Sequence, residues 1–508
     1  MQESLDPEPV QRTWRRASPG LHLVRFLFLR GLGLVYTTAM GGLLFHLPAL
    51  WGEHGLTPVG AFLERVRDHL GADAPTRVPS LFWLGHSDLA LQGMAALGLA
   101  LALLLLLGLA NAPMLAALWL IQLSFVSVGQ VWLGYGWESL LLEVGFLAIF
   151  LAPPLDPRPL RPDPVPPAVI WLLRWVLFRL YLGAGLIKLR GDACWRELTC
   201  LEWHYQTQPN PHPLSWFIHH APPVVHHLGV AWNHLVELVV PFALFLPRPL
   251  RNTAAVLLGS FQVLLILSGN LAWLNWLTLV LCLAAFDDGA LLRLAPARLA
   301  ARVRTLPPAP LSRPRFVVVS GLCLLVGLLS LGPVGNLLSR QQAMNTSFDP
   351  LRLVNSYGAF GSVSEELRVI VILGTADDPD DPAAAWQEYE LPCKPGPPDR
   401  APCLVTPWHF RLDWQAWFAA MQDPASAPWA VHLAWKLVHG DRSVARLLSV
   451  DPFPAAPPRA VRIDLYRYRF TDPGQAGWWH RERLGTWLRP VTADDEAVGA
   501  FLADHGWR

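Results

Sequence analysis

Long apolar runs dominate the first two-thirds of the chain. A bilayer core of about 30 Å is crossed by roughly 17–25 apolar residues in a helix. Runs of about this length lie at 26–49, 90–110, 115–134, 137–152, 168–188, 228–246, 253–269, 270–286 and 316–337. The fourth run is short and contains Glu138 and Glu143. The pattern predicts a polytopic α-helical membrane bundle of about nine spans over residues 26–340, preceded by a cytoplasmic tail over 1–25.

From about residue 345 the pattern changes, because long apolar runs stop and aromatic residues alternate with charged ones. Period-two alternation and β-branched residues are typical of strands. Strands are predicted at 367–373, 387–391 and 461–470, and helices at 411–422 and 428–449. Residues 345–508 are therefore expected to form a strand-rich α+β domain outside the membrane.

Composition supports the membrane class. The chain is 53% hydrophobic and only 16% charged, whereas soluble domains are about 25% charged. The net charge is +1, so no overall field favours a nucleic-acid partner. Lysine occurs only at positions 188, 394 and 436, while arginine, alanine, leucine and proline are abundant. This bias suggests a high-GC genome and hence a bacterial source.

Arginine placement predicts the orientation of the bundle, because cytoplasmic loops collect Lys and Arg. With the N-terminus inside, the inner segments carry Arg12, Arg15, Arg16, Arg158, Arg161, Arg248, Arg251, Arg293, Arg298, Arg302, Arg304, Arg313 and Arg315. Nine spans from an inside N-terminus place the C-terminal domain on the non-cytoplasmic side. A miscount of one span would invert that domain.

Four cysteines lie in segments that this topology places outside. Cys194 and Cys200 follow the fifth run, and Cys393 and Cys403 lie in the C-terminal domain. Disulfides persist in non-cytoplasmic compartments. We therefore predict the bridges Cys194–Cys200 and Cys393–Cys403. The alternative is two pairs of free thiols in a reducing compartment.

Three stretches carry a family resemblance. Residues 355–362 resemble the Asn-Thr-Tyr-Gly-x-Phe-Gly-Ser string of the lipase maturation factor family, and 183–195 is also similar to that family. Residues 407–414 resemble its Pro-Tyr-His-Tyr-Arg-Leu-Asp-Trp string, with Trp408 and Phe410 as departures. The matching family residues are Asn355, Tyr357, Gly358, Phe360, Gly361, His409, Arg411, Asp413 and Trp414.

The resemblance implies a chaperone-like membrane protein, with no known cofactor, that helps secreted lipases or other exported clients reach their active form. The membrane would be the endoplasmic reticulum in a eukaryote and the inner membrane in a bacterium. Surface aromatic residues would contact the client. The candidates for this surface are Trp408, Trp414, Trp417, Trp478 and Trp479.

The phrase Ala-Gly-Leu-Ile-Lys-Leu at 184–189 also looks like the transmembrane core of vitamin K-dependent γ-carboxylase. In that enzyme a lysine in the comparable phrase serves as the base. The resemblance implies an alternative function, a carboxylase-like or quinone-linked membrane enzyme. Lys188 would then act as a general base on a lipid-soluble cofactor or substrate.

Charged residues within spans suggest either a functional cavity or a structural polar network. Lys188 is the only lysine before position 394, and it serves either as a base or as an interfacial anchor. Glu143, His234 and Glu237 lie inside predicted spans. In the enzyme alternative these three residues line one cavity with Lys188, and His234 and Glu237 share a helix face.

Two further groups carry weaker signals. Seven histidines fall between His204 and His234, but none has the H-E-x-x-H ligand spacing, so no metal site is predicted. His409, Arg411 and Asp413 alternate, and on a strand they would share a face. A structural Arg–Asp ion pair there is preferred to a site. Client identity and oligomeric state stay open.

Overall fold

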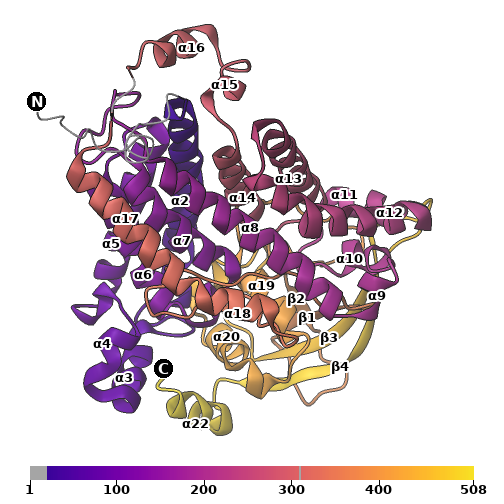
Figure 1. Cartoon of the computed structure of the whole chain (residues 1–508). Helices are drawn as coiled ribbons and strands as arrows, with labels where there is room; N and C mark the ends of the chain where they lie inside the picture. The colour runs from indigo at the N-terminus through magenta and orange to yellow at the C-terminus, as the bar shows by residue number, and fades with distance from the viewer. Residues whose placement is uncertain (1–19, 308–309, 508) are drawn as a thin grey trace, which may run out of the picture.

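The computed structural model describes residues 20–307 and 310–507. A helical bundle makes up the first part, and a sheet with flanking helices makes up the second (Figure 1). The predicted inner arginines Arg12, Arg15 and Arg16 lie outside the described residues. Most of the predicted tail over 1–25 does too.

Each of the nine predicted apolar runs forms helix. The helices are α2 (His22–Leu50), α5 (Asp88–Leu107), α6 (Ala112–Val128), α7 (Gly136–Leu151), α8 (Pro167–Arg190), α12 (Pro223–His234), which continues through η4 (Leu235–Val239) and η5 (Val240–Phe245), α13 (Arg248–Ser268), α14 (Leu274–Cys282) with η6 (Leu283–Ala285), and α17 (Arg313–Leu329) with α18 (Leu331–Leu338). In the described chain six of these are long and apolar enough to span a membrane, whereas α6, α7 and α14–η6 are shorter. The chain is therefore an integral membrane protein with about six spans by length, and the count of nine is not confirmed.

The helix ends gather at two opposite ends of the bundle. The 153–157 turn after α7 receives backbone N–H bonds from Ala110 and Ala112, which lie between α5 and α6. At this same end, Asp163 pairs with Arg25 at 3.0 Å and with Arg315 at 2.8 Å. The helices α15 (Asp288–Leu291) and α16 (Ala297–Arg304) also lie there, far from the strands (Figure 1).

The start of α2 is fixed by a remote carboxylate. Asp288 accepts hydrogen bonds from the N–H groups of His22, Leu23 and Val24 at 2.8–3.0 Å. These N–H groups have no partner within their own helix, and a carboxylate there also complements the helix dipole. The contact ties the first long helix to the start of α15.

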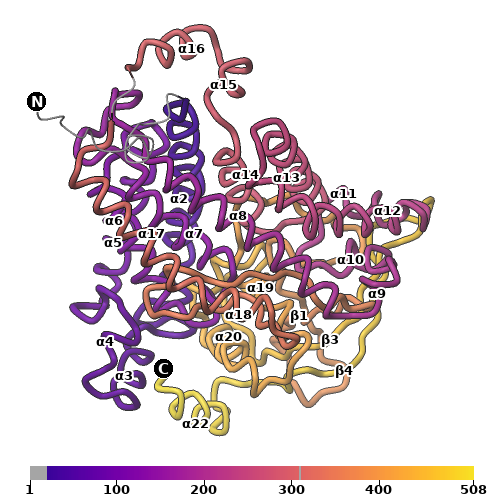
Figure 2. Tube along the Cα trace, viewed as in Figure 1, coloured from indigo at the N-terminus to yellow at the C-terminus, as the bar shows by residue number. Residues whose placement is uncertain are grey.

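Short helices occupy the loops at the other end of the bundle. They are α3 (Val59–Leu70), η1 (Gly71–Asp73), α4 (Ala74–Arg77), η2 (Leu81–Trp83), η3 (Gln130–Leu133), α9 (Ala193–Arg196), α10 (Leu201–Thr207) and α11 (Pro213–His219). The C-terminal part packs against this end (Figure 2). Figure 2 also shows α17 running along the bundle towards it.

The C-terminal part contains an antiparallel sheet of order β2-β1-β3-β4. Its strands are β1 (Leu367–Thr375), β2 (Gln387–Tyr389), β3 (Ala460–Phe470) and β4 (Trp479–Thr492). The first three confirm the predicted strands. The fourth was not predicted, because it is an edge strand whose many charged and exposed positions interrupt the apolar alternation.

Two helices pack against this sheet, α19 (Arg411–Ala419) against β1 and α20 (Pro428–Val438) against β3 and β4. The other helical elements of this part are η7 (Pro424–Ser426), α21 (Arg442–Ala445) and α22 (Glu496–Asp504). The predicted helix over 428–449 is divided in two. Gly440 takes a φ of 69°, which a helix cannot continue, and Asp441 caps α21 through the Ser443 N–H.

The two parts share one hydrophobic core. A single buried cluster includes Leu43 of α2, Ile370 of β1, Leu412 of α19 and Ile463 of β3. The C-terminal part is thus packed onto the bundle. The domain boundary between 340 and 345 stays a prediction.

Candidate functional site: a cavity beside Lys188

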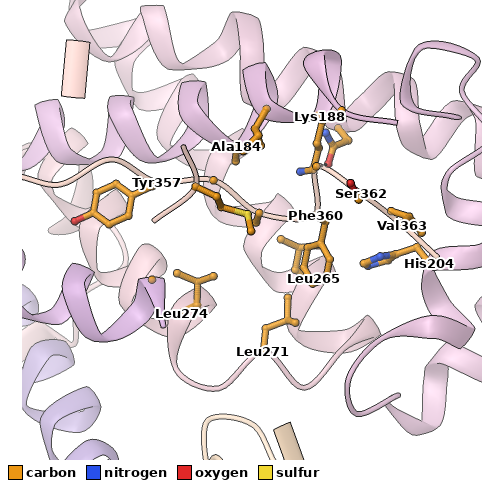
Figure 3. Close-up of a pocket in the computed structure, with 18 of the residues that line it drawn as sticks. Ala184, Lys188, His204, Leu265, Leu271, Leu274, Tyr357, Phe360, Ser362 and Val363 are labelled. Carbon is orange, nitrogen blue, oxygen red and sulfur yellow. Dashed lines mark hydrogen bonds between the residues drawn. The ribbon is translucent and has the colours of Figure 1, made fainter. Parts of the chain in front are cut away.

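A cavity of about 870 Å³ lies between the bundle and the C-terminal part. Its walls come from α7, α8, α10, α12, η4, α13 and α14, from α19, and from the segments 340–345 and 357–364. Figure 3 shows Ala184 and Lys188 on one side and Leu265, Leu271 and Leu274 on another. Most of the lining surface is apolar, and polar groups lie at several places along it, one of them around Lys188. This is the usual composition of a small-molecule site.

Lys188 is buried and paired within this cavity. Its Nζ atom lies 2.6 and 2.7 Å from the two carboxylate oxygens of Glu237 and donates to Asn233 Oδ1 at 3.2 Å. Asn233 Nδ2 donates to the same carboxylate at 2.9 Å. Only 5% of Lys188 is exposed. The side chain is therefore held in the bundle, and it does not reach out to the interface as a snorkelling anchor would.

Local sequence explains how Glu237 reaches Lys188. Pro241 has no N–H group to bond the carbonyl of Glu237, so the α-helix cannot continue regularly through this turn. Residues 235–239 form a π-helical turn instead. Gly185 lets α8 approach closely, since a Cβ atom there would lie 2.7 Å from a methyl group of Leu238.

His234 does not join Lys188. Its Nε2 atom lies 2.9 Å from the backbone oxygen of Trp195, and it is not among the residues that line the cavity. The predicted shared face with Glu237 assumed a regular helix, whereas α12 ends at His234 and the π-helical turn follows.

A second polar group lies elsewhere on the cavity wall. Asn275 donates to Gln262, Gln262 donates to Tyr181, and Tyr181 donates to the backbone oxygen of Leu258, at 2.7–2.8 Å. His204 lines the cavity near Lys188. Burial, and secondly the Lys188 charge, lowers the pKa of His204 to about 4. Its imidazole is therefore neutral at pH 7.

The segment 355–363 lies directly on the last turns of α8. A Cβ atom on Gly183 would overlap the backbone oxygen of Tyr357, and one on Gly191 would overlap that of Gly361. Trp195 Nε1 also donates to the backbone oxygen of Phe360 at 2.8 Å. Two of the three recognised strings thus pack on each other and form part of the cavity wall.

Glu143 belongs to a separate and sealed cluster. It pairs with Arg179 of α8 and accepts hydrogen bonds from the Tyr357 hydroxyl at 2.6 Å and from the Asn355 N–H at 3.0 Å. Each of these four residues is at most 2% exposed. Glu143 does not line the cavity. The four candidate residues therefore divide: Lys188 and Glu237 meet, whereas Glu143 and His234 lie elsewhere.

Arg411 anchors the C-terminal part to the bundle. It lies 3.0 Å from Glu138 and donates to the backbone oxygen of Trp132 at 2.7 Å, and Gln122 donates to the same glutamate at 2.8 Å. The expected Arg411–Asp413 pair is wrong, because both residues lie on α19, where neighbours two apart point in different directions.

Asp413 binds two backbone N–H groups and does not pair with Arg411. It accepts the backbone N–H groups of Cys393 and Lys394 at 2.6 and 2.9 Å. Burial raises the pKa of Asp413 to about 6, although these N–H groups act in the opposite direction. This carboxylate holds the loop that carries the disulfide.

His409 lies among aromatic rings of Tyr135, Trp137, Trp273 and Trp414, with centroid separations of 5.2–6.1 Å. Neither of its ring nitrogens has a hydrogen-bond partner within residues 20–307 and 310–507. Burial lowers its pKa well below the usual value. Over the same residues no group of His, Cys, Asp or Glu side chains is arranged to hold a metal ion.

Both expected disulfides are present. Cys194 pairs with Cys200 at a Cα separation of 4.7 Å, and Cys393 pairs with Cys403 at 5.3 Å. The first bridge lies beside Trp195, and the second lies in the loop that Asp413 holds. Both bridges are at the end of the bundle that faces the C-terminal part.

Two of the five tryptophans expected on the client surface are buried, whereas Trp408, Trp417 and Trp478 are half-buried. Trp414 and Trp479 are only 6% and 2% exposed. Trp417 lines the cavity, while Trp408 packs near Phe45 and His46. These tryptophans mainly pack the interface between the two parts.

Comparison with known families agrees with this two-part construction. Residues 23–293 match the model of the lipase maturation factor transmembrane domain, and residues 353–489 match that of the lipase maturation factor C-terminal domain. The chain belongs to the lipase maturation factor family. The cavity lies where these two family regions meet.

Similar proteins cover almost the whole chain. It is 44% identical to lipase maturation factor 1 of Bos taurus, over 96% of this chain and 91% of that protein. It is 41% identical to the Homo sapiens protein of the same name, over 96% and 90%. Identity to lipase maturation factor 2 of Homo sapiens is 31%, over 96% and 85%. No solved structure shows a significant match.

Several contacts of this family member escaped sequence reasoning. Arg179 lies within a predicted span, which required a partner, but nothing in the sequence identified Glu143. The Arg411–Glu138 pair joins residues 273 positions apart. The insertion of Tyr357 into the bundle also had no local signal.

Proposed function

We propose that this chain is a membrane-embedded maturation factor that helps secreted lipases become active. The observation that carries the proposal is the match of both domains to the lipase maturation factor models. Identity of 41–44% to proteins named lipase maturation factor 1 over nearly the full length supports it. Lipases are thus the clients, and the bundle keeps the C-terminal part at a membrane surface.

The C-terminal part faces the non-cytoplasmic side in this proposal. The end of the bundle away from it holds the arginine-rich helix α16 and the ion pairs of Arg25 and Arg315, as expected for a cytoplasmic face. Both disulfides lie at the other end, as expected for an oxidising compartment. All nine helices would then cross or enter the membrane, including the short ones. The membrane is the endoplasmic reticulum in a eukaryote and the inner membrane in a bacterium.

Deletion of the gene tests the maturation function. We expect a lower specific activity of a secreted lipase with unchanged synthesis, restored when the wild-type chain is supplied. Normal specific activity in the deletion strain contradicts the proposal.

Alkaline phosphatase fused after Arg508 tests the topology separately, because this enzyme needs a disulfide-forming compartment to become active. An active fusion is expected. A fusion made in full amount but inactive places the C-terminal part inside.

A second candidate function is catalysis at Lys188, favoured by one observation. The amine lies in a cavity with the Glu237 carboxylate at 2.6 Å, so a molecule bound there would have a basic and an acidic side chain beside it. A lysine can lose its proton when desolvated, whereas arginine keeps its charge. The variant Lys188→Arg therefore separates base from cation. If a well-folded Lys188→Arg variant no longer restores the specific activity of the secreted lipase, catalysis at Lys188 is supported. Full restoration of that activity overturns the catalytic candidate.

A further inference from the structure

The cavity is large, and much of its wall is apolar. Its volume of about 870 Å³ lies in the upper part of the range of about 300–1,000 Å³ for small-molecule sites. Leucines 264, 265, 271 and 274 and aromatic residues such as Phe360 and Trp417 make up much of the lining. A hydrocarbon chain in the cavity would give these side chains contact partners. Water would find few hydrogen-bonding groups along the apolar walls.

The cavity reaches an apolar outer face of the bundle. Leu264 lines the cavity and is 53% exposed on α13, a helix long and apolar enough to span the membrane. Residues of α8 and α12 also line the cavity. A hydrocarbon chain can therefore enter from the bilayer without passing through water, and the hydrophobic walls favour such a chain.

The charges inside the cavity cancel. Glu237 contacts Lys188 with both carboxylate oxygens, so neither charge is free for an ionic ligand. The other polar groups that line it are uncharged amides and hydroxyls, as in Asn233 and Gln262, and His204 is neutral. Arg190 and Arg340 lie at the edge, where both are exposed.

We propose that this cavity binds one uncharged, single-chain lipid whose headgroup carries hydroxyl or ester oxygens. The headgroup lies beside Lys188, Asn233 and Glu237, and the chain lies along Leu264 and Leu265. This site is independent of the maturation activity. For the catalytic candidate, it names the class of molecule that the same site takes.

Binding would also join the two parts of the chain more firmly. Phe360 and Trp417 face the cavity from the C-terminal side, and Ala184 and Leu265 face it from the bundle. A ligand in contact with both sides stabilises the docked arrangement through mass action. The lipid should therefore raise the melting temperature of the full-length protein.

Photolabelling of the purified full-length protein tests the site. The probe is a monoacylglycerol with a diazirine in its acyl chain, and unlabelled monoacylglycerol is the competitor. Leu265→Trp fills the cavity from α13, and Val263→Trp is the matched control, because Val263 is 44% exposed on the same helix. We expect labelling to fall at least about fourfold in the first variant, as when burial of one to two methylene groups is lost, and to stay near wild type in the second.

Equal labelling of the two variants, or labelling that the competitor does not reduce, overturns the proposal. Ala184→Phe fills the cavity from α8 and replaces Leu265→Trp if that variant folds poorly. These measurements need no lipase, so their failure is distinct from a failure of the maturation function.

A charge variant tests the headgroup class. Wild type should prefer the monoacylglycerol to a fatty acid and to a lysophosphatidic acid of equal chain length. Glu237→Gln leaves the Lys188 charge without its partner, so the preference should move towards the fatty acid by about tenfold, as expected for a hydrogen bond to a charged group. If the wild type prefers the fatty acid or the lysophosphatidic acid, the proposal of an uncharged lipid is contradicted. A preference for the lysophosphatidic acid would indicate that Arg190 and Arg340 bind its phosphate.

Discussion

Arg179 and Lys188 lie on the same helix, about 13 Å apart along its axis, and each is paired with a buried glutamate. Their surroundings differ. Protein groups from 355–357 surround the Arg179–Glu143 pair on the C-terminal side, and neither Arg179 nor Glu143 lines the large cavity, although Tyr357 does. The Lys188–Glu237 pair lines a cavity of about 870 Å³. A buried ion pair can therefore hold an interface together when protein groups pack around it, or form part of a binding site when it lines a cavity.

The buried Arg411–Glu138 pair joins the two parts of the chain, and its loss should have the largest effect on stability. Arg411→Met leaves Glu138 buried without its cation, which should cost about 3–5 kcal/mol of folding free energy. The melting temperature and the monomer yield in detergent measure this loss. Arg459→Met removes an exposed pair with Asp378 and should cost no more than about 1 kcal/mol. Similar losses in both variants would show that the Arg411 pair is not an anchor.

The Arg411–Glu138 pair illustrates which features of the structure the sequence predicts and which it does not. Period and length located the apolar helices and three strands because those signals are local. The edge strand β4 escaped, because its charged residues face solvent and break the alternation. Nothing local told which glutamate Arg411 would meet, since the pairing depends on how the two parts dock.

The cavity was foreseen only in part. A lone lysine and a glutamate inside apolar runs suggested a site because buried charge is costly. The chain did not reveal that a π-helical turn would separate His234 from Glu237, or that Glu143 would be sealed by Tyr357. Those outcomes depend on packing between distant segments.

The loop with the Cys393–Cys403 bridge contacts the bundle, because Asn270 donates to the backbone oxygen of Cys403 at 2.9 Å. Replacing both cysteines by serine should cost about 2–3 kcal/mol, because a short loop is no longer constrained in the unfolded chain. Cys323→Ser is the control, since Cys323 is unpaired. Intact mass after alkylation, with and without reduction, confirms the bridge in the wild type. Full alkylation without reduction would contradict it.

Gly191 lies where the segment 355–363 meets α8, next to the cavity. Gly191→Ala places a methyl group against the Gly361 backbone oxygen, and overpacking of this kind costs about 1–3 kcal/mol. Gly259→Ala is the control, because its nearest neighbour would lie 3.7 Å away. Equal melting temperatures for the two variants would show that α8 does not need this close approach.

Acid should loosen the interface between the two parts. His432 contacts the backbone oxygen of Leu56, and burial lowers its pKa to about 4 from 6.5. The unfolded chain takes up the proton first, so this stabilisation is present above pH 6.5 and is lost as pH falls towards 4. Between pH 7.5 and 5 the wild type should lose about 1–2 kcal/mol more than His432→Gln. Equal losses would exclude His432, and the exposed His54→Gln is the control.

The most direct test of the contrast between the two clusters is the melting temperature of Arg179→Met beside that of Lys188→Met, both as full-length protein. The buried Glu143 loses Arg179, the cation with which it pairs, so we predict a loss of about 3–5 kcal/mol for Arg179→Met. Glu237 can instead be reached by water or by a ligand in the cavity, so the loss for Lys188→Met should be less than half as large. Equal losses would contradict the account, because both clusters would then serve the fold alone.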